Sequence, residues 1–232
     1  MKDKIDSIIF DWDNTLFNFN KYWEIGHQKA YDEFGFNKFV SYDTFICTYK
    51  HFDNLLWKEV LKKHIGLDEL RVRRLIYTLR RFNKSISEED AVDFFKTFFQ
   101  IMLDRIEPDD ELIRKITILK KSYNLCILTN GKLEEQLEKI KRMRFEGFIP
   151  YYISEEIGYE KPDDGAFLFA LNKLDTAPSK TLMIGDSLEN DIKPASKLGM
   201  MTMHIGKEYT KYADYSFESI HEALDELIGR NG

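Results

Sequence analysis

The sequence predicts an α/β protein, a doubly wound parallel sheet with a helical domain inserted after its first strand. Short apolar runs of strand length alternate with amphipathic helical segments after residue 107. This alternation is typical of a parallel sheet that helices cover on both faces. One further apolar run, Ser7–Phe10, precedes them and is separated from them by a long block of helical periodicity. Its length and its acidic boundary favour a buried parallel strand with a polar loop at its carboxyl end.

The helical block sets the domain boundaries. Apolar and aromatic residues recur at spacings of three and four between residues 18 and 104, and no strand pattern interrupts them. We therefore assign residues 18–104 to a helical cap domain and residues 1–17 and 105–232 to the core domain.

Two groups of side chains in the cap allow more than one interpretation. Trp23, His27 and Tyr31 share one face of a predicted helix. They either pack the core of the cap, which we favour, or form a wall on which a nucleotide base stacks. The arginines of the run Arg71–Arg74 and the pair Arg80–Arg81 are interpreted as a solvated helix face, with attraction of anionic substrates as the alternative.

The core domain is expected to alternate helices and strands to residue 205. The predicted helices are Glu111–Lys121, Leu133–Arg142, Ala166–Leu174 and Asn190–Leu198. The predicted strands that follow them in turn are Leu125–Leu128, Tyr151–Ile153, Thr181–Ile184 and Met201–Ile205.

Composition excludes several classes of protein. The 232 residues carry 34 Lys and Arg against 40 Asp and Glu, a net charge of −6 that argues against binding of a nucleic acid polymer. No apolar stretch approaches the roughly 18 residues that a membrane span requires, and the first residues do not resemble a signal peptide. Two widely separated cysteines exclude a disulfide framework. We expect a cytoplasmic protein, monomeric or homodimeric, without a membrane partner.

Acids and hydroxyl groups follow three of the predicted strands. Asp11 and Asp13 follow the first strand, Thr129 and Asn130 follow Leu125–Leu128, and Asp186 and Asp191 follow Thr181–Ile184. Ligands of open parallel sheets bind outside the carboxyl ends of the strands, so these groups are expected to meet there. Converging carboxylates repel one another, and a cation relieves the repulsion; hard oxygen ligands suit Mg²⁺.

A lysine completes the predicted site. Lys161, in the segment Tyr159–Asp163, adds a positive charge to the same rim. One lysine and one Mg²⁺ among carboxylates form a site for a phosphate group, because both charges stabilise the negative charge of a phosphoryl transition state.

Four segments, in this order, resemble the motifs of the haloacid dehalogenase-like hydrolases, and the match spans nearly the whole chain. They are Phe10–Thr15 (FDWDNT), Leu128–Asn130 (LTN), Lys161–Pro162 (KP) and Gly185–Asp191 (GDSLEND). The resemblance implies a Rossmann-like core, and the position of the helical insert is similar to the C1 type of cap in that family. The opening segment through Asn18 is similar to the branch of 5′-nucleotidases and small phosphomonoesterases.

The resemblance also implies a role for each matched residue. Asp11 is expected to attack phosphorus and form an aspartyl-phosphate, and Asp13 to act as general acid and then as general base. Thr129 and the amide of Asn130 are expected to hold a phosphoryl oxygen, and Lys161 to neutralise nucleophile and phosphate. The expected Mg²⁺ ligands are the Asp11 carboxylate, the Asp13 carbonyl and the Asp186 carboxylate, with Asp191 orienting this set.

Within the family, the presence of Asp13 indicates phosphate chemistry and not dehalogenation. The dehalogenases lack an acid two positions after the nucleophile and need no metal, whereas this chain carries Asp13. The expected function is Mg²⁺-dependent hydrolysis of a small phosphomonoester, with a nucleoside 5′-monophosphate favoured over a sugar phosphate or phosphoglycolate. The alternatives are a sugar-phosphate phosphomutase on the same core and a catalytically silent regulatory binding module.

Overall fold

The computed structural model describes residues 5–207 and 210–229. The chain divides into two compact units, one of residues Met1–Phe19 and Ile106–Gly232, the other of residues Asn20–Arg105. No helix in the described ranges is long and apolar enough to cross a bilayer.

The first unit is built on a six-stranded parallel sheet in the order β3-β2-β1-β4-β5-β6. Its strands are β1 (Ser7–Phe10), β2 (Asn124–Thr129), β3 (Tyr151–Ile153), β4 (Thr181–Gly185), β5 (Met201–Ile205) and β6 (Tyr215–Phe217). The α/β prediction and its parallel sheet are confirmed. The order changes direction at β1, between β2 and β4, and such a switch point is where open α/β sheets bind ligands.

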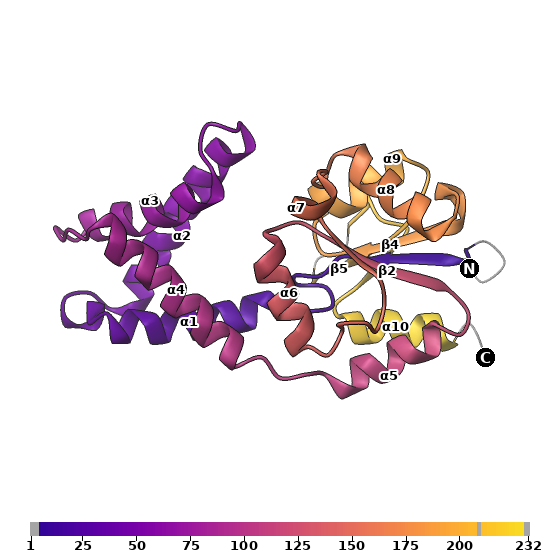
Figure 1. Cartoon of the computed structure of the whole chain (residues 1–232), viewed down its shortest axis with the longest axis horizontal. Helices are drawn as coiled ribbons and strands as arrows, with labels where there is room; N and C mark the ends of the chain where they lie inside the picture. The colour runs from indigo at the N-terminus through magenta and orange to yellow at the C-terminus, as the bar shows by residue number, and fades with distance from the viewer. Residues whose placement is uncertain (1–4, 208–209, 230–232) are drawn as a thin grey trace. The chain divides into compact units, whose positions relative to one another are not determined.

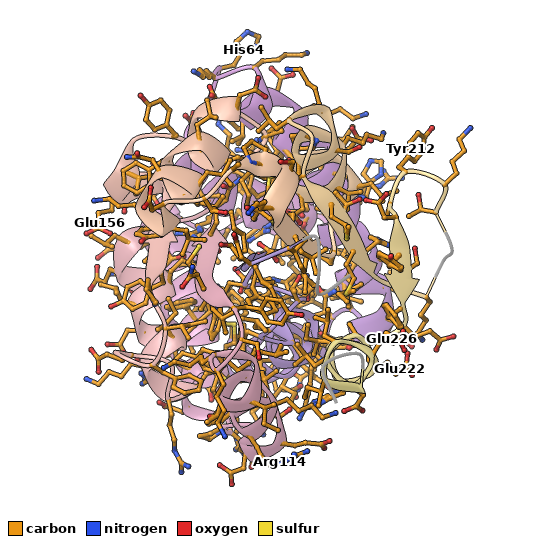
Figure 2. The ribbon with its side chains drawn as sticks, turned by 90° about the vertical axis from the view of Figure 1, so that its right-hand side faces the viewer. His64, Arg114, Glu156, Tyr212, Glu222 and Glu226 are labelled. Atoms are coloured by element: carbon orange, nitrogen blue, oxygen red, sulfur yellow. The ribbon has the colours of Figure 1, made fainter. Side chains whose placement is uncertain are left out.

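Helices cover both faces of this sheet. They are α5 (Asp110–Leu119), α6 (Leu133–Arg142), α7 (Ser154–Ile157), α8 (Asp164–Leu174), α9 (Lys193–Lys197) and α10 (Ile220–Gly229). Figure 1 shows α8 and α9 on one face of the sheet, with α5 and α10 on the other. In α10, Ala223, Leu224 and Leu227 are buried, whereas Glu222 and Glu226 point outward (Figure 2). This amphipathic division explains how the helix is fixed to the sheet.

The core on the α8 side consists of apolar side chains from the three central strands. Ile9, Cys126 and Met183 are fully buried against Phe167 of α8. Burial of each large apolar side chain contributes about 1.5–3 kcal/mol, which fixes the strands and hence the loops at their carboxyl ends. Burial also raises the pKa of the Cys126 thiol, so this cysteine is an inert part of the core.

The last part of the first unit differs from the prediction. A π-helix, Leu188–Ile192, precedes α9, where the sequence predicts one continuous helix over Asn190–Leu198. The Ile192 amide donates to the Ser187 carbonyl five residues earlier. Pro194 lacks an amide hydrogen and stands at the start of α9, where a proline is tolerated. Strand β6 and helix α10 were not predicted.

The second unit is helical in its described residues. It contains α1 (Phe19–Glu33), a short 3₁₀ helix (Phe36–Lys38), α2 (Tyr42–Leu61), α3 (Leu67–Arg80) and α4 (Glu88–Asp104). Ser87 caps α4, because its side chain accepts from the Asp90 amide at 3.0 Å. Glu88 and Glu89 follow in the first turn, where the helix dipole favours acids.

Aromatic rings form the core of this unit. His27 is fully buried and packs against Trp23, Tyr49 and Phe98, with ring centroids 4.1–4.5 Å away. Tyr31 is also buried and packs against Phe45 among other rings. This geometry favours core packing over a base-stacking wall for both His27 and Tyr31.

The interpretation of the arginine run as a solvated face is wrong for Arg74 and does not fit Arg71, whose side chain is 12% exposed and stacks on the Phe95 ring at 4.0 Å. Arg74 is 6% exposed, pairs with Asp53 and stacks on the Tyr49 ring at 4.3 Å. Its guanidinium is thus covered by an aromatic ring and its charge is met by a carboxylate within the same unit.

Candidate active site

Asp11 directly follows β1, at the switch point of the sheet. Its amide donates to the Ile184 carbonyl of β4 at 2.8 Å, and the residue is 6% exposed. Its Oδ1 accepts from the Lys161 Nζ at 2.7 Å, whereas its Oδ2 is buried without a hydrogen-bond partner in the described chain. One oxygen therefore orients the carboxylate, and the other is available to a reacting group.

The loop after Asp11 makes a tight turn at Asn14, closed by a hydrogen bond between Phe17 and Trp12. Asn14 has a φ of 63°, in the left-handed region that asparagine tolerates better than most residues. The Phe17 amide then donates to the Trp12 carbonyl at 2.9 Å and closes the turn. This turn places the Asp13 side chain beside α6, where it accepts hydrogen bonds from Gln136 and Lys139.

Lys161 lies between two carboxylates. Its Nζ is 2.7 Å from both the Asp11 Oδ1 and the Asp191 Oδ1, and the side chain is 2% exposed. The Asn130 side chain holds the backbone of Lys161 through two hydrogen bonds. The Asn130 Nδ2 donates to the Lys161 carbonyl at 2.7 Å, and the Lys161 backbone amide donates to the Asn130 Oδ1 at 2.9 Å. The loop after β2 thus positions the lysine opposite Asp11.

Asp191 is fixed from the π-helix that follows β4. Besides Lys161, it binds the Ser187 amide, which donates to its Oδ2 at 3.0 Å. Gly185 makes this approach possible, because a Cβ there would lie 2.5 Å from the Asp191 Oδ2. Both oxygens of Asp191 are thus engaged.

Asp186 is half-buried beside this cluster. One oxygen each from Asp11, Asp186 and Asp191 lie within 4.8 Å of one another. The Asp186 backbone carbonyl accepts from the His204 Nε2 at 3.0 Å, so this ring nitrogen is the protonated one. His204 therefore orients the residue that presents the third carboxylate.

Burial and mutual repulsion perturb these acids. The pKa of Asp11 is raised to about 7: burial is the largest cause, Lys161 opposes it, and repulsion from Asp191 and Asp186 adds to it. The pKa of Asp186 is raised to about 6, mainly by burial and then by repulsion from Asp191, with Lys161 opposing. Burial acts to lower the pKa of Lys161, but its two carboxylate partners outweigh burial and raise it. The cluster therefore favours a protonated carboxyl or an added cation.

The structure brings most of the predicted residues to the carboxyl ends of β1, β2 and β4. Asp11, Lys161, Asp186 and Asp191 form the buried cluster, and Asn130 supports it. Thr129 is 1% exposed at the end of β2, and its hydroxyl donates to the Asn130 carbonyl at 3.3 Å. The Asp13 carboxylate does not join the cluster and lies against α6.

Sequence reasoning missed three polar residues at this site. They are Gln136 and Lys139 of α6, which bind Asp13, and His204 of β5. Gln136 and Lys139 are spaced by three residues on the side of α6 that also buries Ile140. Polar side chains on the apolar face of a helix are the signal that could have revealed them.

Known proteins resemble this chain in sequence and structure. A profile of the haloacid dehalogenase-like hydrolases matches residues 8–205. A glyceraldehyde 3-phosphate phosphatase of Methanocaldococcus jannaschii is 27% identical over 95% of this chain and 96% of its own length. The pyrimidine 5′-nucleotidase PynA of Streptococcus pneumoniae is 24% identical over 95% of each chain.

A solved structure shows the same fold. The HAD-hydrolase YfnB of Bacillus subtilis, solved with bound magnesium, superposes with a TM-score of 0.80 at 21% identity. The superposition covers 97% of this chain and 99% of that one. The profile match over residues 8–205 and the carboxylate cluster at the switch point together show that this chain belongs to the haloacid dehalogenase-like hydrolase family.

Proposed function

We propose that this protein is a Mg²⁺-dependent phosphomonoesterase that acts through an aspartyl-phosphate on Asp11. The observation that carries the proposal is the state of the Asp11 carboxylate. Lys161 holds its Oδ1 at 2.7 Å, and its Oδ2 is buried without a partner among the described residues. A carboxylate oriented at one oxygen and free at the other suits in-line attack on phosphorus.

The residues present fit a divalent cation. Oxygens of Asp11, Asp186 and Asp191 lie within 4.8 Å of one another, and hard carboxylate donors suit Mg²⁺. Asp11, Asp186 and the Asp13 carbonyl would hold the ion, and Asp191 would position Lys161, because both of its own oxygens are engaged. When bound, Mg²⁺ supplies positive charge that favours the ionised carboxylates and the transferring phosphoryl group.

The remaining residues fit the other roles. Lys161 provides a fixed positive charge next to the nucleophile, and Thr129 at the end of β2 would hold a phosphoryl oxygen together with the Asn130 amide. Asp13 would give a proton to the leaving alcohol and take one from the water that hydrolyses the aspartyl-phosphate. The two displacements return Asp11 to its starting form.

The substrate class we propose is a small phosphomonoester. Relatives named as a glyceraldehyde 3-phosphate phosphatase and a pyrimidine 5′-nucleotidase support this class. Nucleoside 5′-monophosphates and triose phosphates are therefore the first substrates to assay.

The test is phosphate release from a panel of nucleotides and sugar phosphates, with Mg²⁺ and with EDTA. We expect free phosphate as the product, no turnover in EDTA and recovery when Mg²⁺ is added. In Asp186→Ala, the Mg²⁺ concentration for half-maximal rate should rise at least about 10-fold, because one carboxylate ligand is lost.

Asp110→Ala is the matched control, because the side chain of Asp110 is 86% exposed on the first turn of α5. Its Mg²⁺ titration should equal that of the wild type. Full turnover in EDTA, or an isomerised sugar phosphate in place of free phosphate, would contradict the proposal.

A further inference from the structure

Two side chains of α6 hold both oxygens of Asp13. The Lys139 Nζ lies 2.6 Å from the Asp13 Oδ1 and 2.7 Å from its Oδ2. The Gln136 Nε2 donates to the same Oδ2 at 2.9 Å. Gln136 and Lys139 are 3% and 4% exposed, whereas the Asp13 side chain is 27% exposed. A partly exposed carboxylate is therefore anchored by two buried donors.

The position of the Lys139 ammonium is restricted by its surroundings. It lies 5.6 Å from the centroid of the Phe17 ring and 4.9 Å from that of Phe19. Aromatic faces attract a cation, but they do not replace a hydrogen-bond acceptor. A buried ammonium requires a carboxylate partner, so moving Asp13 away from Lys139 is opposed electrostatically.

Gln136 connects Asp13 to the phosphate-binding end of the site. Its Nε2 also lies 2.7 Å from the Asn130 carbonyl and 3.2 Å from the Thr129 hydroxyl. A carbonyl only accepts hydrogen bonds, so this terminal atom is the nitrogen. Gly131, with a φ of 134°, leaves room for the amide, because a Cβ there would lie 2.9 Å from the Nε2.

We propose that Lys139 and Gln136 are positioning residues that fix Asp13 for its two proton transfers. The protonated carboxyl gives its proton to the leaving oxygen, and the carboxylate that remains takes a proton from the water that hydrolyses the aspartyl-phosphate. This inference rests on the role of Asp13 in the proposed function. A general acid acts only within hydrogen-bond reach of the leaving oxygen, and a displacement of about 1 Å at such a group can cost about 100-fold in rate. The Gln136 side-chain amide binds both Asp13 and Thr129, so it fixes the position of Asp13 relative to the residue proposed to hold a phosphoryl oxygen.

The test compares two leaving groups by kcat/KM, which reports steps up to formation of the aspartyl-phosphate. p-Nitrophenolate leaves without protonation, whereas the alkoxide of glycerol 2-phosphate needs a proton. We expect Lys139→Met to lower kcat/KM for glycerol 2-phosphate about 10- to 100-fold, with a loss for p-nitrophenyl phosphate of less than about 3-fold. Lys139→Arg should recover part of the loss, because it keeps a cation facing Asp13.

Three variants complete the experiment. Asp13→Asn should show the same selective loss, and Asp13→Asn with Lys139→Met should be no slower than Asp13→Asn, because the two residues act on one step. If Lys139→Met fails to fold, Gln136→Leu serves instead, because it removes the other hydrogen-bond donor that holds the Asp13 carboxylate. Lys141→Met is the matched control, because Lys141 lies exposed on the same helix; its kcat/KM should match the wild type for both substrates.

Equal losses for both substrates in folded Lys139→Met, or additive effects in the double variant, overturn the inference and leave the proposed function standing. Absence of leaving-group selectivity in Asp13→Asn overturns the proposed role of Asp13, and the positioning role falls with it.

Discussion

Asp11→Asn is expected to lower kcat by at least about 10⁴-fold without unfolding the protein. The amide is nearly isosteric with the carboxylate, so the packing at the end of β1 is retained. It is a poor nucleophile, however, and forms no aspartyl-phosphate. The measurement is steady-state phosphate release, with circular dichroism to show that the α/β fold is intact.

Stability provides an independent readout for the same variant. The pKa of Asp11 is raised to about 7, so its contribution to stability is present below pH 4 and is lost as the pH rises toward 7 and above. In EDTA at pH 8, Asp11→Asn should therefore be at least as resistant to urea as the wild type. Asp110→Asn, at an exposed position of α5, should change neither activity nor stability. Retained turnover in a folded Asp11→Asn protein would contradict the assignment of the nucleophile.

Lys161→Met is expected to have the largest effect on stability. It leaves Asp11 and Asp191, both buried, without the cation that each contacts at 2.7 Å. Loss of one partner from a buried ion pair costs about 3–5 kcal/mol, and we expect a loss of this size at pH 8 in EDTA. The measurement is the free energy of unfolding from urea titrations.

The pH dependence of this loss has a definite sign. Lys161 opposes the raised pKa of Asp11, so without the lysine the pKa of this carboxyl rises further. A carboxyl whose pKa is raised in the folded state destabilises the protein as the pH rises through that value, so the deficit should be smaller at pH 5 than at pH 8. Lys197→Met is the control, because this lysine is 71% exposed and its ion pair with Asp164 is worth less than about 1 kcal/mol. A deficit that is equal at pH 5 and pH 8 would contradict this electrostatic account.

The convergence of the acids was predictable from the sequence because it depends only on where the strands end and on the strands being parallel. A parallel sheet places all strand ends of one kind at one edge, so Asp11 and Asp186 could be placed together although they lie 175 positions apart in the sequence. Each acid directly follows a short apolar run, which identifies both the strand and its end.

The contacts within the site depend on side-chain geometry that periodicity does not encode. That Lys161 lies between Asp11 and Asp191 follows from the Asn130 hydrogen bonds and from the space left by Gly185. A π-helix differs from an α-helix by one residue in its hydrogen bonding, which an apolar pattern of a few residues does not resolve. Strand β6 has the sequence Tyr-Ser-Phe and is only partly buried, so it lacks the continuous apolar run that identifies the other strands.

The two polar side chains of α6 were missed for a different reason. Leu133–Arg142 was predicted as a helix, and its buried face could be assigned from the apolar residues. Gln136 and Lys139 on that face have meaning only once Asp13 is known to lie opposite them, and that requires the path of the loop through Asn14 and Phe17.

The central claim is that an oxygen of Asp11 bonds to phosphorus, and chemical trapping tests it most directly. The enzyme is mixed with Mg²⁺ and substrate, quenched in acid during turnover and reduced with borohydride, which converts an acyl phosphate to the alcohol. We predict homoserine at position 11 by peptide mass spectrometry, dependent on substrate and absent without Mg²⁺. Reduction at another residue, or no reduced carboxyl during rapid burst turnover, would contradict the account.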